Sequence, residues 1–374
     1  MNPAAARLER LAVHDFRNLA HVELEAPADG FVLIGENGQG KTNILEAIHY
    51  LHLLRSSRGA RDQDVVRFGA DGFHLRAAIA TDRDHEISIG FERGGKRKRV
   101  RVDNVIPEKL SDALGALPSV LFSPDDVALV TGAPSGRRRY LDIMLALTSR
   151  RYLHALQRYR TALGHRNAAL RDPSRSPATV AVWEPPLAEF GAQLLVERRQ
   201  WVAGVESGFG TLAATIGETG DSRLRYASTV PASDDSASAI ARALEDKRPS
   251  DMRRGVTQVG PHRDDLVMSL DGRDIRVFGS AGQQRTAAIV LRMLEAATFT
   301  ERTTRAPIFL LDDPFAELDV RRSTRILEWL ARDGRGQGGG QTILAVPRET
   351  DIPSELTRLE RLRVAGGAIE RFAV

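Results

Sequence analysis

Residues 35–42 read GENGQGKT and fit the phosphate-binding pattern G-x-x-x-x-G-K-[ST]. In such a loop, backbone N–H groups and the start of the next helix point toward a phosphate chain. Lys41 is expected to reach the β- and γ-phosphates and to act in catalysis, and Thr42 is expected to ligate Mg²⁺. The expected nucleotide-binding residues are Gly35, Glu36, Asn37, Gly38, Gln39, Gly40, Lys41 and Thr42. The alternative is a glycine-rich turn that matches the pattern by chance.

A second pair of chemical residues follows an apolar run at 308–311. Asp312 and Asp313 end this run, as in a Walker B strand that delivers carboxylates from its C-terminal end. We expect Asp312 to hold Mg²⁺ through water and Asp313 to orient or deprotonate the attacking water. An apolar strand ending in two aspartates is common by itself. Together with the phosphate loop, which it must meet in space, it predicts ATP and Mg²⁺ as cofactors.

Hydrophobic periodicity predicts the elements that position these residues. Residues 31–34 form an apolar strand before the loop, and apolar residues recur at helical spacing over 44–51 after it. Other strand candidates are short runs, and a helix is expected over 283–298. The strand candidates are 22–24, 75–79, 86–91, 100–102, 266–270, 275–278 and 342–346, with turns at 94–95 and 271–272.

Helical periodicity dominates the middle of the chain. It runs from 137 to 170, with a break expected near 148–149. A second helix begins at Pro185 and Pro186, since proline is favoured in a first turn. Two such helices predict an antiparallel hairpin of about 40–50 Å at 1.5 Å per residue, and the alternative is two core helices lying on the sheet. The expected division is a discontinuous α/β head, 1–135 and 217–374, and an inserted helical arm domain, 136–216.

The composition is that of an ordinary globular protein, with 374 residues, 42% hydrophobic and 27% charged. No eighteen apolar residues run together, and Glu9, His14 and Asp15 interrupt any signal-peptide core. We therefore expect a cytoplasmic protein without a membrane partner. Zero cysteines exclude disulfides and thiolate metal sites. The net charge of +4 does not by itself indicate nucleic-acid binding.

Two basic clusters are candidates for contact with DNA phosphates. Lys96 and Arg97 open a KRKR run in a hairpin, and Arg137, Arg138 and Arg139 open the expected arm. Such residues pair with phosphates and release counterions, although a charge run is more often a solvated face. Only 6% of residues are aromatic, and no interleaved aromatic pattern marks a stacking platform. Contact with the backbone of duplex DNA therefore fits better than base stacking.

Two further motifs resemble those of ABC-type ATPases. SAGQQ at 280–284 resembles their signature, and PFAELD at 314–319 resembles their D-loop. In that superfamily the signature of one head caps the γ-phosphate held by a second head. The resemblance therefore implies that Ser280, Gly282 and Gln283 bind nucleotide in trans, where a hydroxyl, a backbone N–H and a helix N-terminus form an anion site. The alternative for 280–284 is a simple capped helix.

Over nearly its whole length the chain resembles the RecF family of bacterial recombination mediators. The phosphate loop and the residues that follow it to 48 carry this resemblance, together with several other strings. These are DFRNL at 15–19, FSPDD at 122–126, GRRRYLD at 136–142, RN at 166–167 and GPHRDD at 260–265. His262 in the last string is left with a nucleotide-site or a structural role, and a lone histidine disfavours a metal site.

The resemblance implies an ABC/SMC-type P-loop ATPase head with a short antiparallel helical arm, an ATP-dependent head-to-head dimer and DNA binding. It also implies a role in replication and recombinational repair. Partner mediators would load the recombinase at single-strand gaps or stalled forks.

Two departures from ABC transporters predict slow hydrolysis, which the resemblance implies is stimulated by DNA. The strand at 342–346 ends in Pro347 and Arg348 without the switch histidine. Asp313 stands where transporters carry glutamate, whose longer side chain comes closer to the water. The rival functions are a transporter ATPase subunit, which leaves 260–265 unexplained, and a nucleotide-gated DNA-binding scaffold with negligible hydrolysis.

Overall fold

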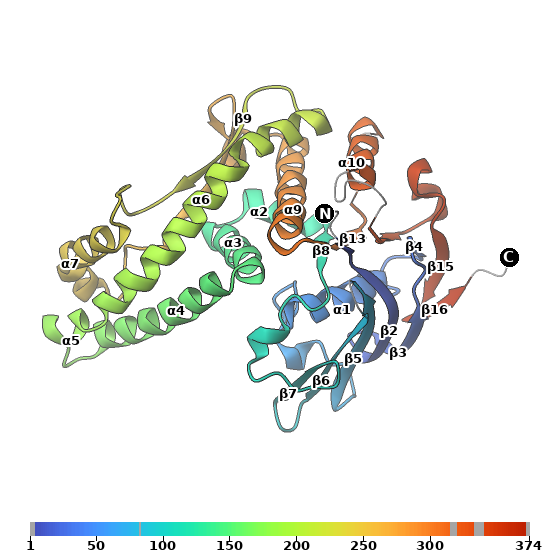
Figure 1. Cartoon of the computed structure of the whole chain (residues 1–374), viewed down its shortest axis with the longest axis horizontal. Coiled ribbons are helices and arrows are strands. Elements are labelled where there is room, and N and C mark those ends of the chain that lie inside the picture. Colours follow the sequence, from blue (N-terminus) through green and yellow to red (C-terminus); the bar gives the residue numbers. More distant parts are fainter. Residues whose placement is uncertain (1–3, 82–83, 315–319, 333–339, 372–374) are drawn as a thin grey trace. The chain divides into compact units, whose positions relative to one another are not determined.

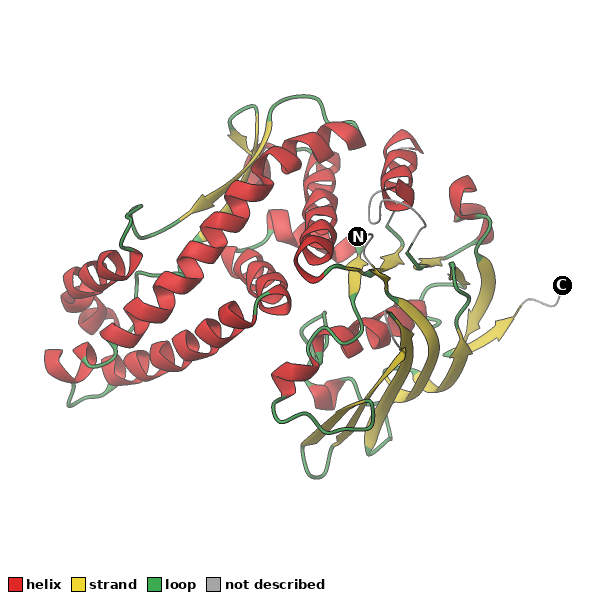
Figure 2. Cartoon of the chain, in the orientation of Figure 1, coloured by secondary structure: helices red, strands yellow, loops and turns green. Residues whose placement is uncertain are grey.

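The computed structural model describes residues 4–81, 84–314, 320–332 and 340–371. The chain forms two compact units, Met1–Asp126 with Glu295–Val374, and Val127–Leu294. Figure 1 follows the chain through both units by colour. Figure 2 shows that most strands belong to the first unit and most helices to the second.

A mainly parallel sheet forms the nucleotide-facing part of the first unit. Its strands are β4 Gly30–Ile34, β8 Ser119–Phe122, β13 Ile308–Asp312, β14 Thr342–Val346, β15 Glu360–Ala365 and β16 Ala368–Arg371. They lie in the order β16-β15-β4-β14-β13-β8, with only β16 antiparallel to its neighbour. Every residue of β4 and β14 is buried, as expected for parallel strands covered on both faces.

An antiparallel sheet forms the rest of the core of the first unit. Its strands are β2 Arg7–Phe16, β3 Leu19–Glu25, β5 Gly72–Ala80, β6 Asp84–Glu92 and β7 Arg97–Val102. They lie in the order β3-β2-β5-β6-β7. Apolar side chains such as Leu75, Ile79, Ile87 and Ile89 alternate into the core and are fully buried. Helix α1, Lys41–Leu53, packs against strands of both sheets.

Short elements complete the first unit. They are β1 Ala4–Ala5, β12 Arg305–Ala306, α10 Val320–Arg332 and 3-10 turns at Asp62–Asp64, Leu110–Ala113, Pro124–Val127, Glu349–Asp351 and Ser354–Leu356. Across the described parts of the chain, no helix has both the length and the apolar character needed to cross a membrane.

The second unit is mainly helical. Its elements are α2 Ala128–Thr131, α3 Pro134–Thr148, α4 Arg150–Arg171, α5 Pro177–Ala181, α6 Glu184–Ile216, β9 Ser222–Ala227, α7 Ser236–Arg254, β10 Asp265–Leu270, β11 Arg273–Asp274, α8 Ile275–Phe278 and the first part of α9 Ala281–Thr303. Helices α4 and α6 run antiparallel, since Tyr152 contacts Arg198 and Arg166 contacts Glu184. The expected antiparallel helical pair is confirmed. The break between α3 and α4 lies at Ser149, whose side chain accepts a hydrogen bond from the Tyr152 N–H.

Three features of the second unit differ from the expectation. Helix α7 was not predicted, because few of its positions are apolar and buried and Pro249 lies inside it. Residues 275–278 form α8 instead of a strand, since Asp274 accepts a hydrogen bond from the Arg276 N–H and caps a helical turn. The unit also extends beyond the expected range 136–216 to Val127–Leu294, because α6 packs against both α7 and β9.

Candidate nucleotide site

The phosphate loop lies between β4 and α1 of the first unit. Gly38 and Gly40 have φ angles of 81° and 116°, in the left-handed region that glycine adopts without a Cβ penalty. Gly40 is the N-cap of α1, and a Cβ there would lie 3.0 Å from Asn18 Oδ1. The loop therefore ends at a helix N-terminus, which is the arrangement that binds phosphate.

Lys41 is buried and closes the loop onto itself. Its Nζ donates to the carbonyl oxygens of Gly35 and Glu36 at 2.5 and 2.9 Å. Burial lowers the pKa of Lys41, while the charges of Asp312 and Asp313 raise it. The ammonium thus lies between the loop carbonyls and two acids, where a phosphate chain adds a further negative partner.

Two motifs far apart in the sequence meet at the carboxyl ends of β4 and β13. Strand β14 pairs with β4 on one side and with β13 on the other. The Thr42 hydroxyl donates to Asp312 Oδ1 at 2.9 Å. Burial raises the pKa of Asp312, the hydrogen bond from Thr42 opposes this shift, and the charge of Asp313 adds to it. A hydroxyl and a carboxylate placed together offer the oxygen ligands that Mg²⁺ prefers.

Asp313 follows β13 and has a backbone conformation that residues other than glycine seldom adopt. Its φ is 43°, and its N–H donates to the Ala345 carbonyl oxygen at 3.0 Å, so the chain turns sharply here. Asp313 lines a cavity of about 530 Å³ together with Pro347 and Arg348, which follow β14. The Arg348 guanidinium pairs with Asp351 at 3.1 Å. A proline and a paired arginine therefore take the place of the switch histidine.

Two turns support the phosphate loop, and the sequence patterns did not reveal either role. The N–H groups of Gly366 and Gly367, in the turn between β15 and β16, donate to Gln39 Oε1 at 2.6 Å and to the Gln39 carbonyl oxygen at 2.9 Å. Asn18, in the turn between β2 and β3, donates to the Gly38 carbonyl oxygen at 3.3 Å. Asn18 belongs to the DFRNL string, which thus acts by supporting the loop.

A buried acid anchors α1 behind the loop. Glu46 is 1% exposed and accepts hydrogen bonds from the Arg17 guanidinium at 2.8 and 3.0 Å and from the Ser56 hydroxyl at 2.6 Å. Arg58 adds an ion pair with Glu46 at 3.6 Å. Burial raises the pKa of Asp312, and the charge of Arg58 partly opposes this rise. Glu46 therefore connects α1 to the β2–β3 turn and to the segment that follows α1.

The set expected to act in trans lies at the N-terminus of α9 and comprises Ser280, Gly282 and Gln283. Ser280 Oγ accepts from the Gln283 N–H at 3.3 Å, and Gln283 Oε1 accepts from the Ser280 N–H at 2.8 Å. These contacts form a capping box, so the alternative of a capped helix describes them. Ser280 is nevertheless exposed, as are Val277 and Phe278 just before it. The expected D-loop lies outside the described residues from 315 to 319.

The prediction that Arg137 contacts DNA is wrong. Arg137 is 2% exposed, and its guanidinium donates to Asp265 at 2.7 and 2.9 Å and to three backbone carbonyl oxygens at the end of α2. It therefore caps α2 and holds β10 instead of facing solvent. Arg138 is half-buried and donates to the Asp264 carbonyl oxygen at 2.8 Å. Of the three arginines only Arg139 is exposed.

Lys96 and Arg97 lie at the exposed hairpin end between β6 and β7. Lys98, the next residue of the KRKR run, instead pairs with Asp62 at 2.9 Å and donates to the Leu54 carbonyl oxygen. Side chains alternate along the strand, so the basic run is divided between a solvated face and a packed face.

The GPHRDD string at 260–265 has a structural role within the second unit. His262 hydrogen-bonds to Tyr159 Oη at 2.7 Å, and burial lowers the pKa of His262 to about 4. Asp264 accepts a hydrogen bond from the Tyr226 hydroxyl at 2.7 Å. These contacts connect the string to α4 and β9, which favours the structural alternative for His262.

Comparison with known proteins gives the family. Residues 7–346 match the family described as RecF/RecN/SMC N terminal domain. The chain is 38% identical to the DNA replication and repair protein RecF of Symbiobacterium thermophilum, over 86% of this chain and 87% of that protein. A solved structure of the recombination mediator protein RecF with ATP in the RecFOR pathway superposes with a TM-score of 0.90 at 27% identity, covering 99% of both chains. An Smc head bound to the C-winged helix domain of ScpA, at 13% identity and a TM-score of 0.55 over 98% of both chains, shares the fold alone. The family match over residues 7–346 confirms the expected ABC/SMC-type head. The chain therefore belongs to the RecF family.

Proposed function

We propose that the chain is an ATP-dependent DNA-binding protein of replication and recombinational repair. The observation that carries this proposal is the 2.9 Å contact between Thr42 and Asp312, next to Lys41. It joins the phosphate loop and the carboxylates at one edge of the sheet, where open α/β sheets bind ligands. The name of the relatives, DNA replication and repair protein, and the ATP bound by the solved RecF support it.

ATP and Mg²⁺ are the proposed cofactors. Thr42 and Asp312 would hold the metal ion, because their hydroxyl and carboxylate oxygens suit Mg²⁺. When bound, Mg²⁺ neutralises phosphate charge. The Lys41 ammonium exchanges its loop carbonyls for phosphate oxygens, and the backbone N–H groups of 35–42 hold the phosphate chain. Asp313 orients or deprotonates the attacking water.

ATP is proposed to join two copies of the chain head to head. Ser280 is exposed at the N-terminus of α9, a helix of 23 residues whose first N–H groups suit a phosphate held by a second copy. Val277 and Phe278, which are 60% and 69% exposed, add apolar surface that an interface would cover. Ser280, Gly282 and Gln283 would then complete the partner's nucleotide site.

Hydrolysis is proposed to be slow and stimulated by DNA. Asp313 is one methylene shorter than glutamate, and Arg348 pairs with Asp351 where transporters place a histidine. The same two features support a second candidate, a nucleotide-gated DNA-binding scaffold with negligible hydrolysis. The RecFOR pathway of the solved relative supports action with other mediators, which we place at gaps or stalled forks in the cytoplasm.

Phosphate release with and without duplex DNA tests the proposed function. We expect slow release that rises with DNA, and no ATP response for Lys41→Met, because the phosphates lose their cationic partner. Lys247→Met, at an exposed lysine of α7, is the matched control and should behave as wild type. ATP binding without release, with or without DNA, would support the scaffold. Failure of the wild type to bind ATP would contradict both candidates.

A further inference from the structure

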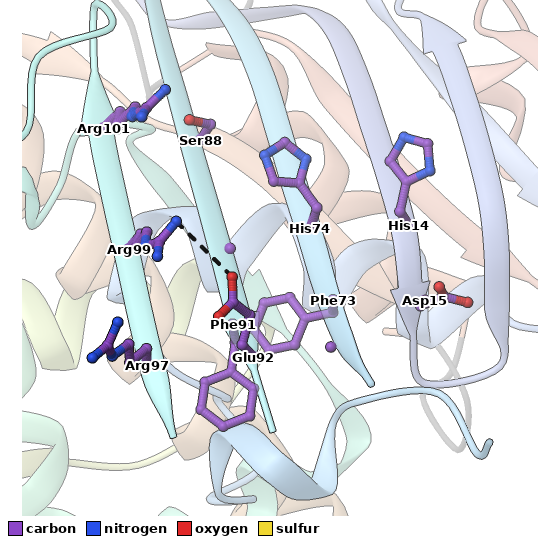
Figure 3. Close-up of a pocket in the computed structure, with 12 residues that line it drawn as sticks. His14, Asp15, Phe73, His74, Ser88, Phe91, Glu92, Arg97, Arg99 and Arg101 are labelled. Carbon is purple, nitrogen blue, oxygen red and sulfur yellow. Dashed lines mark ion pairs between the residues drawn. The ribbon is translucent and has the colours of Figure 1, made fainter. Parts of the chain in front are cut away.

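We infer that the outer face of the antiparallel sheet binds the phosphate backbone of duplex DNA, an inference that rests on the proposed DNA-binding function. This face carries a hollow of about 450 Å³ that crosses β2, β5, β6 and β7 (Figure 3). The hollow is termed the sheet trough, and the residues that matter most are His14, His74, Ser88, Arg97, Arg99 and Arg101.

Three arginines of β7 line the sheet trough because side chains alternate along a strand. Arg97, Arg99 and Arg101 share one face, whereas Lys98 and Val100 lie on the packed face. Figure 3 shows the three guanidinium groups in a row along β7, on the side of the sheet that also carries Ser88 and His74. Their Cα atoms are about 6.6–6.8 Å apart along the strand. A row of cations at a regular interval suits the regularly repeated charges of a nucleic-acid backbone.

The sheet trough stays positively charged after its own acids are counted. Among the described residues, Arg97 and Arg101 have no ion-pair partner. Arg99 lies 3.9 Å from Glu92, and both side chains are more than half exposed, so solvent screens this pair. Asp15, the other acid of the trough, is paired with Arg67 at 2.6 Å. The arginines are therefore available to an anionic partner.

The histidines supply hydrogen-bonding groups between these charges. The Nδ1 atoms of His14 and His21 are 3.0 Å apart, so one donates and the other accepts in this hydrogen bond. Burial lowers the pKa of His74, and the charges of His14 and Arg76 lower it further. Imidazole N–H groups and the Ser88 hydroxyl are donors of the kind that contacts phosphate oxygens.

The aromatic residues of the sheet trough do not offer a stacking surface. Phe73 and Phe91 line the trough but are 3% and 6% exposed, and their rings stack on each other at 5.8 Å. Unpaired bases need an exposed aromatic face. The trough therefore favours the backbone of a duplex, whose bases are already stacked, over a single strand. The arm entry offers less charge, because only Arg139 of its three arginines is exposed.

Duplex binding by a triple variant tests this inference. Arg97→Ala, Arg99→Ala and Arg101→Ala remove three cations from exposed positions, so thermal unfolding and ATP binding should be unchanged. Fluorescence anisotropy of a labelled duplex should show weaker binding for all sequences alike. The slope of log K against log salt should become shallower by about 0.9 for each lost phosphate contact.

A second triple variant removes the same charge from exposed positions of the second unit. It carries Arg151→Ala, Arg158→Ala and Arg175→Ala, and it should keep the wild-type salt slope. A wild-type slope in the first triple variant would overturn the inference and leave DNA binding by the protein intact. Equal losses in both variants would assign the effect to total charge and would also overturn it. Absence of duplex binding by the wild type would instead contradict the proposed function.

Discussion

His52 is a buried histidine whose charged form the fold opposes. It is 1% exposed, and within the described residues its Nδ1 has no hydrogen-bond partner. Burial lowers the pKa of His52 to about 3, although a backbone hydrogen bond with Leu117 opposes the shift. The unfolded chain takes up this proton near pH 6.5. The stability that neutral His52 contributes is therefore fully present above about pH 6.5 and is lost as the pH falls toward about 3.

His52→Leu should flatten the pH dependence of stability. Between pH 7 and pH 5 the wild type should lose about 2 kcal/mol of unfolding free energy through His52, at about 1.4 kcal/mol per pH unit below 6.5. Leucine cannot take up the proton, so the variant should lack this decline in urea unfolding at pH 7, 6 and 5. His154→Leu, at an exposed position, should keep the wild-type slope. If His52→Leu kept the wild-type slope, His52 of the wild type would have to take up its proton in the folded protein, which would contradict this prediction.

Residue types with a required spacing were easier to predict than the exposure of charged side chains. Lys41 and Thr42 belong to one motif and Asp312 to another, and the structure places them together. Arg137 and Arg139 look alike in the sequence, yet only Arg139 is exposed. The burial of Arg137 depends on Asp265, a partner far along the chain that no local pattern identifies.

At the scale of elements, two buried arginines connect the helices of the second unit. Arg166 of α4 is fully buried and donates to Asp251 of α7 at 2.7 Å and to Glu184 of α6 at 3.0 Å. Arg198 of α6 is 2% exposed and donates to Asp142 of α3 at 2.6 Å. The helical pair is therefore one part of a packed unit and depends on charges satisfied between elements.

Arg166→Met should destabilise the second unit strongly. Removing one partner leaves Asp251 and Glu184 buried with fewer cations, which typically costs about 3–5 kcal/mol of unfolding free energy. Urea unfolding followed through Trp183 and Trp201, both in this unit, measures the loss. Arg160→Met is the control, since Arg160 is 57% exposed and its pair with Asp142 is worth about 1 kcal/mol or less. Equal effects of the two replacements would contradict a structural role for the buried network.

Hydrophobic periodicity predicts the elements that bury a single face. It fails for elements whose conformation depends on tertiary contacts. The expected strands at 75–79 and 86–91 fall within β5 and β6, whose side chains alternate between core and solvent. Helix α7 escaped prediction because Pro249 argues against a helix, although Asp251 within it is buried against Arg166. An ion pair between residues so far apart in the sequence cannot be recognised from a short stretch of sequence.

At the scale of the whole molecule, nucleotide chemistry and assembly are proposed to be coupled. The phosphate loop and Asp313 belong to the first unit, whereas Ser280 belongs to the second. Within one chain the hydrogen bonds between Ser280 and Gln283 cap α9. We propose that Ser280 meets the γ-phosphate of another copy, so that ATP would bind across the interface and hydrolysis would open it.

Asp313→Asn and Ser280→Arg should separate hydrolysis from assembly. Asparagine keeps the size of Asp313 and removes its charge, so ATP should bind, hydrolysis should fall by about 10²-fold or more and the dimer should persist. Arginine at 280 places a bulky side chain where the partner's phosphate must dock, so ATP should bind while the dimer is lost. Light scattering in ATP measures both outcomes. Ser207→Arg, at an exposed position of α6, is the matched control and should dimerise normally.

Off-rates from duplex DNA then decide between the two candidate functions. If hydrolysis is the release step, Asp313→Asn should leave DNA more slowly than wild type in ATP, because its dimer cannot open by turnover. Ser280→Arg should fail to accumulate on DNA. A Ser280→Arg dimer as stable as that of wild type would contradict capping in trans. Equal off-rates for Asp313→Asn and wild type, with hydrolysis shown to be lost, would separate turnover from release and favour the nucleotide-gated scaffold.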